Sequence, residues 1–227
     1  MKIAIIGAMD KEVELISKAL ENKKILNILN YKFEIGNLFN HEVILTVSSI
    51  GKVATGMLMG VLFSNFSNID KIINIGVAGG VKGKINPGDV MVSEKLSYSD
   101  ADARGFGYEY GQIPRCPLYY YGDETMIKVV DADIKKGTIL TADVFQTNEE
   151  DVKNVIESYF KNDNVLCLDM ESTAFAQCSF KQNIGFLAIR AVSDVIGADD
   201  QTTKYENTLE IACSKAHDVL MDILQKI

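Results

Sequence analysis

Apolar runs that end in a glycine or an acidic residue, each followed by an amphipathic stretch, repeat along most of the chain. The runs predict strands at residues 2–6, 32–36, 42–47, 71–76, 89–96, 137–143, 164–170 and 185–195, with 32–36 and 42–47 as an antiparallel pair. Apolar positions three or four residues apart predict helices at 10–22, 51–65, 122–133, 148–160, 171–180 and 203–227. This alternation is typical of a parallel sheet covered on both faces. We therefore predict a single α/β domain, residues 1–227, with a mixed, mostly parallel central β-sheet flanked by helices.

One segment, residues 98–121, breaks the alternation. It reads YSDADARGFGYEYGQIPRCPLYYY, which is rich in tyrosine and glycine and has no periodicity. Long irregular loops in compact domains usually carry function. We expect this segment to contribute to binding.

Composition excludes several classes of protein. The 227 residues are 47% hydrophobic and 24% charged, which is typical of an ordinary globular protein, and the net charge of −8 without a dense basic block argues against a nucleic-acid partner. The first apolar stretch is short and closed by acids, so we interpret it as a buried strand rather than an export signal. The run 53–63 is too short to span a bilayer, which argues against a membrane partner.

The cysteines and histidines point to a cytoplasmic protein without a metal. None of the four cysteines has C-x-x-C spacing and two lie in apolar runs, which suits reduced thiols in a cytoplasm. The two histidines are isolated, so a zinc site is not expected. No cofactor is expected either.

Three acidic residues follow apolar strands: Glu12, Glu171 and Asp194. Each has an ordinary structural explanation, because an acid in the first turn of a helix complements the helix dipole and an aspartate often caps a turn. The carboxyl ends of strands in an open α/β sheet, however, are where ligands gather. Three acids at such positions predict a shared pocket.

The glycine turn GVAGGVKGK, residues 76–84, does not match a phosphate-binding loop. Ala78 stands where the Walker motif requires glycine, and Ile85 stands where it requires serine or threonine. DADARG at residues 100–105 likewise fails as a calcium loop, because Arg104 and Gly111 occupy ligand positions. The glycine turn remains either a close-approach surface for a ligand or simply a tight turn.

Six segments together resemble the nucleoside phosphorylase/nucleosidase family over nearly the whole chain. They are, in order, IIGAMDKEV, SIGKVAT, NIGVAGG, DADARGFGYEYGQIP, LDMEST and IRAVSDV. The resemblance implies a nucleoside phosphorylase-like fold. It also implies hydrolysis of the N-glycosidic bond of 5′-methylthioadenosine and S-adenosylhomocysteine with release of adenine, in nucleoside catabolism and methionine salvage.

The resemblance also implies roles for individual residues. Glu12 would activate the attacking water and Asp194 would protonate purine N7, which divides the work as in glycoside hydrolysis. Glu171 would accept hydrogen bonds from the two ribose hydroxyls, since a carboxylate offers two acceptor oxygens. Asp169 would be structural. Arg190 would orient the water or Glu12.

The remaining roles implied by the family concern the base, the sugar and a second subunit. Phe145 would stack near adenine, and the backbone of Gln146 would bind its edge. Phe106 and Pro114, in the irregular segment, would enter the pocket of a neighbouring subunit, which implies a homodimer. The other expected substrate-binding residues are Met9, Ile50, Ala78, Gly79, Met170, Ser193 and Tyr205.

The sequence leaves two alternatives open, a phosphorylase and a non-catalytic nucleoside-binding protein. Phosphate needs cationic or hydroxyl donors, yet Asn74 and Val77 stand where phosphorylases of the family tend to carry arginine and serine. Val77 also replaces a hydroxyl residue that relatives usually have. Glu12 would repel an anion, which favours water as the nucleophile. Retention of both Glu12 and Asp194 argues against a purely binding role.

Overall fold

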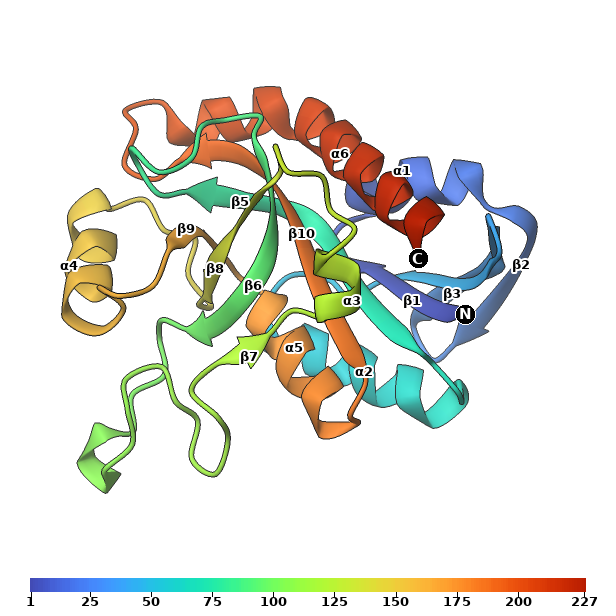
Figure 1. Cartoon of the computed structure of the whole chain (residues 1–227), viewed down its shortest axis with the longest axis horizontal. Helices are drawn as coiled ribbons and strands as arrows, with labels where there is room; N and C mark the ends of the chain where they lie inside the picture. Colours follow the sequence, from blue (N-terminus) through green and yellow to red (C-terminus); the bar gives the residue numbers. More distant parts are fainter.

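A ten-stranded mixed sheet runs through the molecule, in a computed structural model that describes all 227 residues (Figure 1). The strand order is β10-β6-β8-β9-β5-β1-β4-β3-β2, with the short β7 on β6. Five pairings are parallel and five antiparallel, so the predicted mixed sheet is confirmed but is less dominated by parallel pairs than the pattern indicated. The strands are β1 (Lys2–Gly7), β2 (Glu21–Ile28), β3 (Tyr31–Leu38), β4 (His41–Val47), β5 (Lys71–Gly80), β6 (Val90–Tyr98), β7 (Tyr120–Tyr121), β8 (Lys135–Thr141), β9 (Val165–Asp169) and β10 (Gly185–Val195).

Half of this sheet closes on itself. β10 pairs with both β6 and β5, so β5, β9, β8, β6 and β10 form a continuous ring. β1, β4, β3 and β2 extend outward from β5. Closure brings the ends of β5, β9 and β10 to one place, which becomes important below.

Helices cover both faces of the sheet. α1 (Asp10–Ala19) and α6 (Gln201–Lys226) pack together on one side, where α6 contacts β10 and β5. α2 (Lys52–Asn65) and α5 (Ser172–Lys181) pack together on the other side (Figure 1). α3 (Glu124–Ile127), α4 (Glu149–Tyr159) and the 3-10 turn η1 (Arg104–Phe106) complete the chain. Leu209, Ala212, Ala216, Leu220 and Ile223 are buried on α6 at helical spacing, which is why this long helix lies flat on the sheet.

Two predicted elements differ in the structure. The helix expected at residues 122–133 extends only over α3, because α3 ends at the β-branched Ile127 and the β-branched Val129 and Val130 that follow disfavour continuation. The helix expected to reach residue 22 ends at Ala19, and β2 begins at once. β2 was not predicted because its residues are almost all exposed and do not alternate between apolar and polar.

None of the helices combines the length and the apolar character that a bilayer span needs. All four cysteines are free, with Cys167 and Cys213 buried and the other two half-buried.

Candidate active site

A cavity of about 450 Å³ opens where β5, β9 and β10 end and α1 begins. Glu12, Glu171 and Asp194, the three acids that follow strands in the sequence, all line it. The other predicted residues that line it are Met9, Ile50, Ala78, Gly79, Phe145, Gln146, Met170, Ser193 and Tyr205. The ring closure of the sheet explains this convergence, since residues from distant segments meet where β5 pairs with both β9 and β10.

Glu12 is held in its position by three backbone N–H groups. Its Oε2 accepts from Ala8 N at 2.7 Å and from Met9 N at 3.0 Å, and its Oε1 accepts from Val77 N at 3.1 Å. A Cβ on Gly76 would come within 2.4 Å of Oε1, so only glycine allows this approach. Burial raises the pKa of Glu12, while the charge of Arg190 and the three N–H groups act in the opposite direction.

Glu171 lies at the start of α5 and lines the cavity. Its Oε1 accepts a hydrogen bond from Gly51 N at 2.8 Å, which ties α5 to the start of α2. Burial, and then the negative charge of Asp169, raises its pKa to about 7. The second oxygen, Oε2, accepts no hydrogen bond from the protein and is therefore available to a ligand.

Asp194 lies at a bulge in β10, where the pairing with β5 shifts register. Ser193 Oγ donates to its Oδ1 at 2.5 Å, and Gln201 Nε2 donates to its Oδ2 at 2.7 Å. Burial raises the pKa of Asp194, and the two donors partly oppose that shift. A buried carboxyl with a raised pKa in a cleft is suited to proton transfer.

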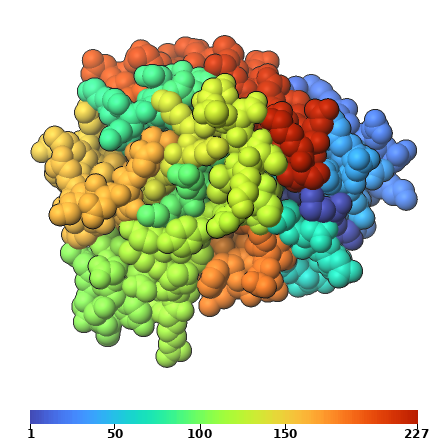
Figure 2. Space-filling view, in the orientation of Figure 1, coloured from blue at the N-terminus to red at the C-terminus, as the bar shows by residue number.

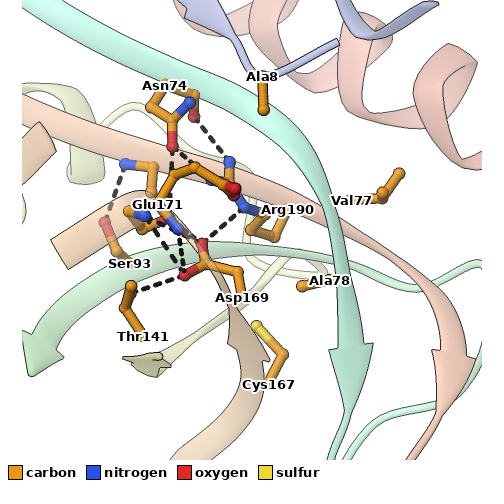
Figure 3. A network of polar contacts seen from close by, with 12 residues as sticks. Ala8, Asn74, Val77, Ala78, Ser93, Thr141, Cys167, Asp169, Glu171 and Arg190 are labelled. Atoms are coloured by element: carbon orange, nitrogen blue, oxygen red, sulfur yellow. Dashed lines mark hydrogen bonds and ion pairs between the residues drawn. The ribbon is translucent and has the colours of Figure 1, made fainter. Parts of the chain in front are cut away.

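Arg190 does not line the cavity and makes no hydrogen bond to Glu12. Its Nε donates to Asp169 Oδ2 at 2.9 Å, and its Nη1 donates to the main-chain oxygens of Ile189 and Asn74 (Figure 3). Its Nη2 donates to the side-chain oxygen of Asn74. Arg190 therefore belongs to a buried network beside the cavity, and its charge acts on Glu12 without a hydrogen bond between them; that it orients the water or Glu12 stays a prediction.

Asp169 is the centre of that network. Thr141 Oγ1 donates to it at 2.6 Å, and the hydroxyl of Ser172 donates to it as well. Its side chain is 1% exposed. These contacts fix the end of β9 against β8, β10 and the start of α5, and so hold Glu171 two residues further on.

Aromatic and apolar side chains form the mouth of the cavity. Phe145 meets Tyr205 edge to face, with ring centroids 5.9 Å apart. Tyr205 Oη donates to the sulfur of Met9 at 3.6 Å. Phe145 and Ile50 are about half exposed, so the mouth is open to solvent.

Phe106 and Pro114 do not line this cavity. They lie in the irregular segment after β6, which is drawn in green and projects from the rest of the molecule (Figures 1 and 2). The side chain of Phe106 is 87% exposed. The segment is nevertheless anchored, because Arg104 Nη1 donates to Tyr159 Oη at 2.8 Å and Tyr110 stacks on Tyr159.

Gln201 is a cavity residue that the sequence did not reveal. It is the first residue of α6, two positions before the predicted start of that helix, and its side chain is buried. Besides its bond to Asp194, Nε2 donates to the main-chain oxygen of Gln146 at 2.8 Å. The only available signal was a polar amide close after the acid that ends β10, which is too weak to single it out.

Comparison with known proteins relates this geometry to one family. The family model described as phosphorylase superfamily matches residues 2–225. A 5′-methylthioadenosine/S-adenosylhomocysteine nucleosidase from Geobacillus sp. is 34% identical, over 100% of this chain and 99% of the relative.

Solved structures agree in fold. The 5′-methylthioadenosine/S-adenosylhomocysteine nucleosidase of Streptococcus pneumoniae, solved with the transition-state inhibitor MT-ImmA, has a TM-score of 0.93 and 34% identity, with 99% of both chains covered. The nucleosidase of Colwellia psychrerythraea, solved with adenine, has a TM-score of 0.90 and 31% identity, covering 100% of this chain and 95% of that one.

Proposed function

We propose that this chain, which belongs to the phosphorylase superfamily, hydrolyses the N-glycosidic bond of 5′-methylthioadenosine and S-adenosylhomocysteine and releases adenine. Relatives that carry these names match it over their full length. The fold alone does not separate hydrolysis from phosphorolysis, because a fold hosts several chemistries. The choice rests on the cavity.

The composition of the cavity favours water over phosphate. Its lining includes five acidic residues and neither lysine nor arginine. An inorganic phosphate would lie among like charges without the charge-assisted donors that normally bind it. Arg190, whose charge acts on Glu12, is not in the lining and is already bound to Asp169 and Asn74. This cation-free lining is the observation that carries the proposal.

Glu12 is the proposed base. Three N–H groups fix both of its oxygens on the glycine-turn side of the cavity, where the reacting carbon of the sugar would lie. A carboxylate held in this way can orient a water and accept its proton without reorganising. Val77 has no side-chain hydroxyl, but its backbone N–H supports Glu12.

Asp194 is the proposed acid. Cleavage leaves negative charge on the departing purine, so a proton delivered to N7 stabilises the transition state. Burial favours the protonated form of Asp194, as this role requires.

Glu171 and Met170 are proposed to hold the ribose, while Phe145 and the Gln146 backbone hold the base. Glu171 faces the cavity with one oxygen free of protein donors, which suits a vicinal diol. Phe145 contributes an aromatic face at the mouth, where an adenine ring can stack.

We also propose a cytoplasmic homodimer that acts in nucleoside catabolism and methionine salvage. The exposed side chain of Phe106, on a segment anchored to Tyr159, supports the dimer because an exposed aromatic group on a well-held loop is suited to contact a partner.

The function is tested by incubating the protein with a panel of 5′-substituted adenosines in phosphate-free buffer and measuring released adenine. We expect release without phosphate and a free pentose as the second product. A strict phosphate requirement with formation of a pentose 1-phosphate would show that the enzyme is a phosphorylase. Binding without turnover would instead support a nucleoside-binding protein.

A further inference from the structure

The side chain of Gln201 is completely engaged within the protein. Its Nε2 donates to Asp194 Oδ2 at 2.7 Å and to the Gln146 main-chain oxygen at 2.8 Å, and its Oε1 accepts from Gly197 N at 3.0 Å. Gln201 is 5% exposed and lines the cavity. Its amide nitrogen thus lies between two acceptors, one from the end of β10 and one from the segment before α4.

Both groups are proposed above to contact the purine, Asp194 at N7 and the Gln146 backbone at its edge, and the amino group of adenine is next to N7. The amino group of adenine is a flat nitrogen with two N–H donors, and so is the carboxamide nitrogen of glutamine. A group of this kind between Asp194 and Gln146 satisfies both acceptors at once. The hydrogen bonds that Gln201 makes from within the chain are therefore of the kind that the amino group of a 6-aminopurine can make to the same two acceptors.

We propose that Gln201 is a placeholder for the amino group of adenine, which must leave its two acceptors before a nucleoside binds and returns to them after adenine departs. The inference rests on the proposed function. It makes Gln201 a residue that sets affinity, since each binding event replaces two internal hydrogen bonds by two to the ligand.

Replacing Gln201 by adenine, and adenine by Gln201, has a physical benefit both before and after the reaction. A buried carboxylate oxygen and a buried carbonyl oxygen that lack a donor each carry a desolvation cost, and Gln201 supplies that donor to Asp194 Oδ2 and to the Gln146 oxygen. Gln201 also lowers the pKa of Asp194, so its departure favours the protonated acid that cleavage needs. Its return helps to expel adenine.

The rival interpretation is that Gln201 only positions Asp194 and stays in place when ligand binds. The two interpretations predict opposite changes in adenine affinity. Removing a competitor tightens binding, because the fraction of molecules with a free site rises. Removing a positioning group weakens binding, because Asp194 loses its orientation.

Titration calorimetry with adenine on purified protein distinguishes them. We expect Gln201→Ala and Gln201→Met to bind adenine roughly three- to tenfold more tightly than wild type, as for a site occupied internally most of the time. Gln201→Met retains the side-chain length without its donors, so it separates hydrogen bonding from volume. Thr203→Ala, an exposed position in the same helical turn, should bind like wild type.

Steady-state kinetics give a second readout, since KM for the nucleoside should fall in both Gln201 variants. Unchanged or weaker adenine binding by folded Gln201→Ala and Gln201→Met would overturn the placeholder role alone, because wild type would still bind adenine. A wild-type protein that neither binds nor releases adenine would overturn the proposed function and the placeholder role together.

Discussion

Arg190 donates from Nε to Asp169 Oδ2 across 2.9 Å, and the two side chains are 2% and 1% exposed. Asp169 lines the cavity and Arg190 does not, so the ion pair binds the guanidinium just outside the lining. Asp169 also binds Thr141 and Ser172, which fixes the turn that carries Glu171. The acids that face the ligand are therefore supported by a charge pair of which only Asp169 reaches the cavity lining.

Asp169→Ala should destabilise the protein severely. Removal of one partner leaves the guanidinium of Arg190 buried and unpaired, which typically costs about 3–5 kcal/mol. The free energy of unfolding in urea measures the effect. Glu14→Ala removes a partner from the exposed Glu14–Lys18 pair and should change that free energy by no more than about 1 kcal/mol. Equal effects for the two variants would contradict a structural role of Asp169.

Glu171→Gln should lower kcat/KM for a ribonucleoside by about tenfold to a hundredfold. The amide lacks one charge-assisted acceptor for the sugar diol, which contributes roughly 1.5–3 kcal/mol. A substrate analogue without the 2′ and 3′ hydroxyls is the control, because wild type and Glu171→Gln should then differ little. Asp169→Asn, if folded, should lose less activity than Glu171→Gln. If Glu171→Gln lost as much kcat/KM on the analogue as on the ribonucleoside, Glu171 would not act through the sugar diol.

Glu171 should also make stability depend on pH. Its pKa rises from 4.5 to about 7 in the folded chain, mainly through burial. The folded state therefore binds a proton that the unfolded state has already released, so this contribution is complete below about pH 4.5 and is lost as pH rises through 7. Glu12 and Asp194 shift in the same direction.

The difference in unfolding free energy between pH 5 and pH 8 isolates this contribution. It should be smaller in Glu171→Gln than in wild type by about 2–3 kcal/mol. Urea denaturation of wild type and Glu171→Gln at pH 5 and pH 8 gives the four unfolding free energies required. A pH dependence identical in both proteins would show that Glu171 titrates normally.

Asp194→Asn should abolish turnover while adenine still binds. Asparagine keeps the size of the side chain and its hydrogen-bonding capacity but cannot deliver a proton to the base. The loss should therefore appear in kcat, by at least about a hundredfold. Stopped assays with adenine detection, together with an adenine titration, measure both quantities. Near-normal kcat would mean that Asp194 is a turn residue only, since asparagine is equally suited to turns.

Phe106→Ala should raise KM several-fold without a change in thermal stability. The side chain is 87% exposed in the single chain, so only a contact with a partner subunit gives it an effect on substrate. Leu29→Ala is the matched control, because Leu29 is 79% exposed at the turn between β2 and β3. Light scattering on wild type should give a dimer mass. A monomer, or equal kinetics for both variants, would count against the shared pocket.

The sequence by itself determined the buried strands and the acids that end them. β5 and β10 are nearly uninterrupted apolar runs, and Asp194 lies one residue before the end of β10. The local pattern was therefore sufficient to identify both strands and this acid. Glu12 and Glu171 were found in the same way, as acids at the first turns of helices that follow strands. The resemblance to a family then supplied their roles.

Only the tertiary structure decided what these residues touch. The ring through β5 and β10 depends on pairing between segments more than a hundred residues apart, which no local periodicity encodes. The hydrogen-bonded pairing of Arg190 with Asp169 was not predicted, because the sequence places arginine in a strand without telling which buried carboxylate it meets. Gln201 was not predicted either, because its contacts come from segments distant in the sequence. A glutamine at the start of a helix is usually solvated, and only the approach of α6 to β10 and to the segment of Gln146 gives its amide two buried acceptors.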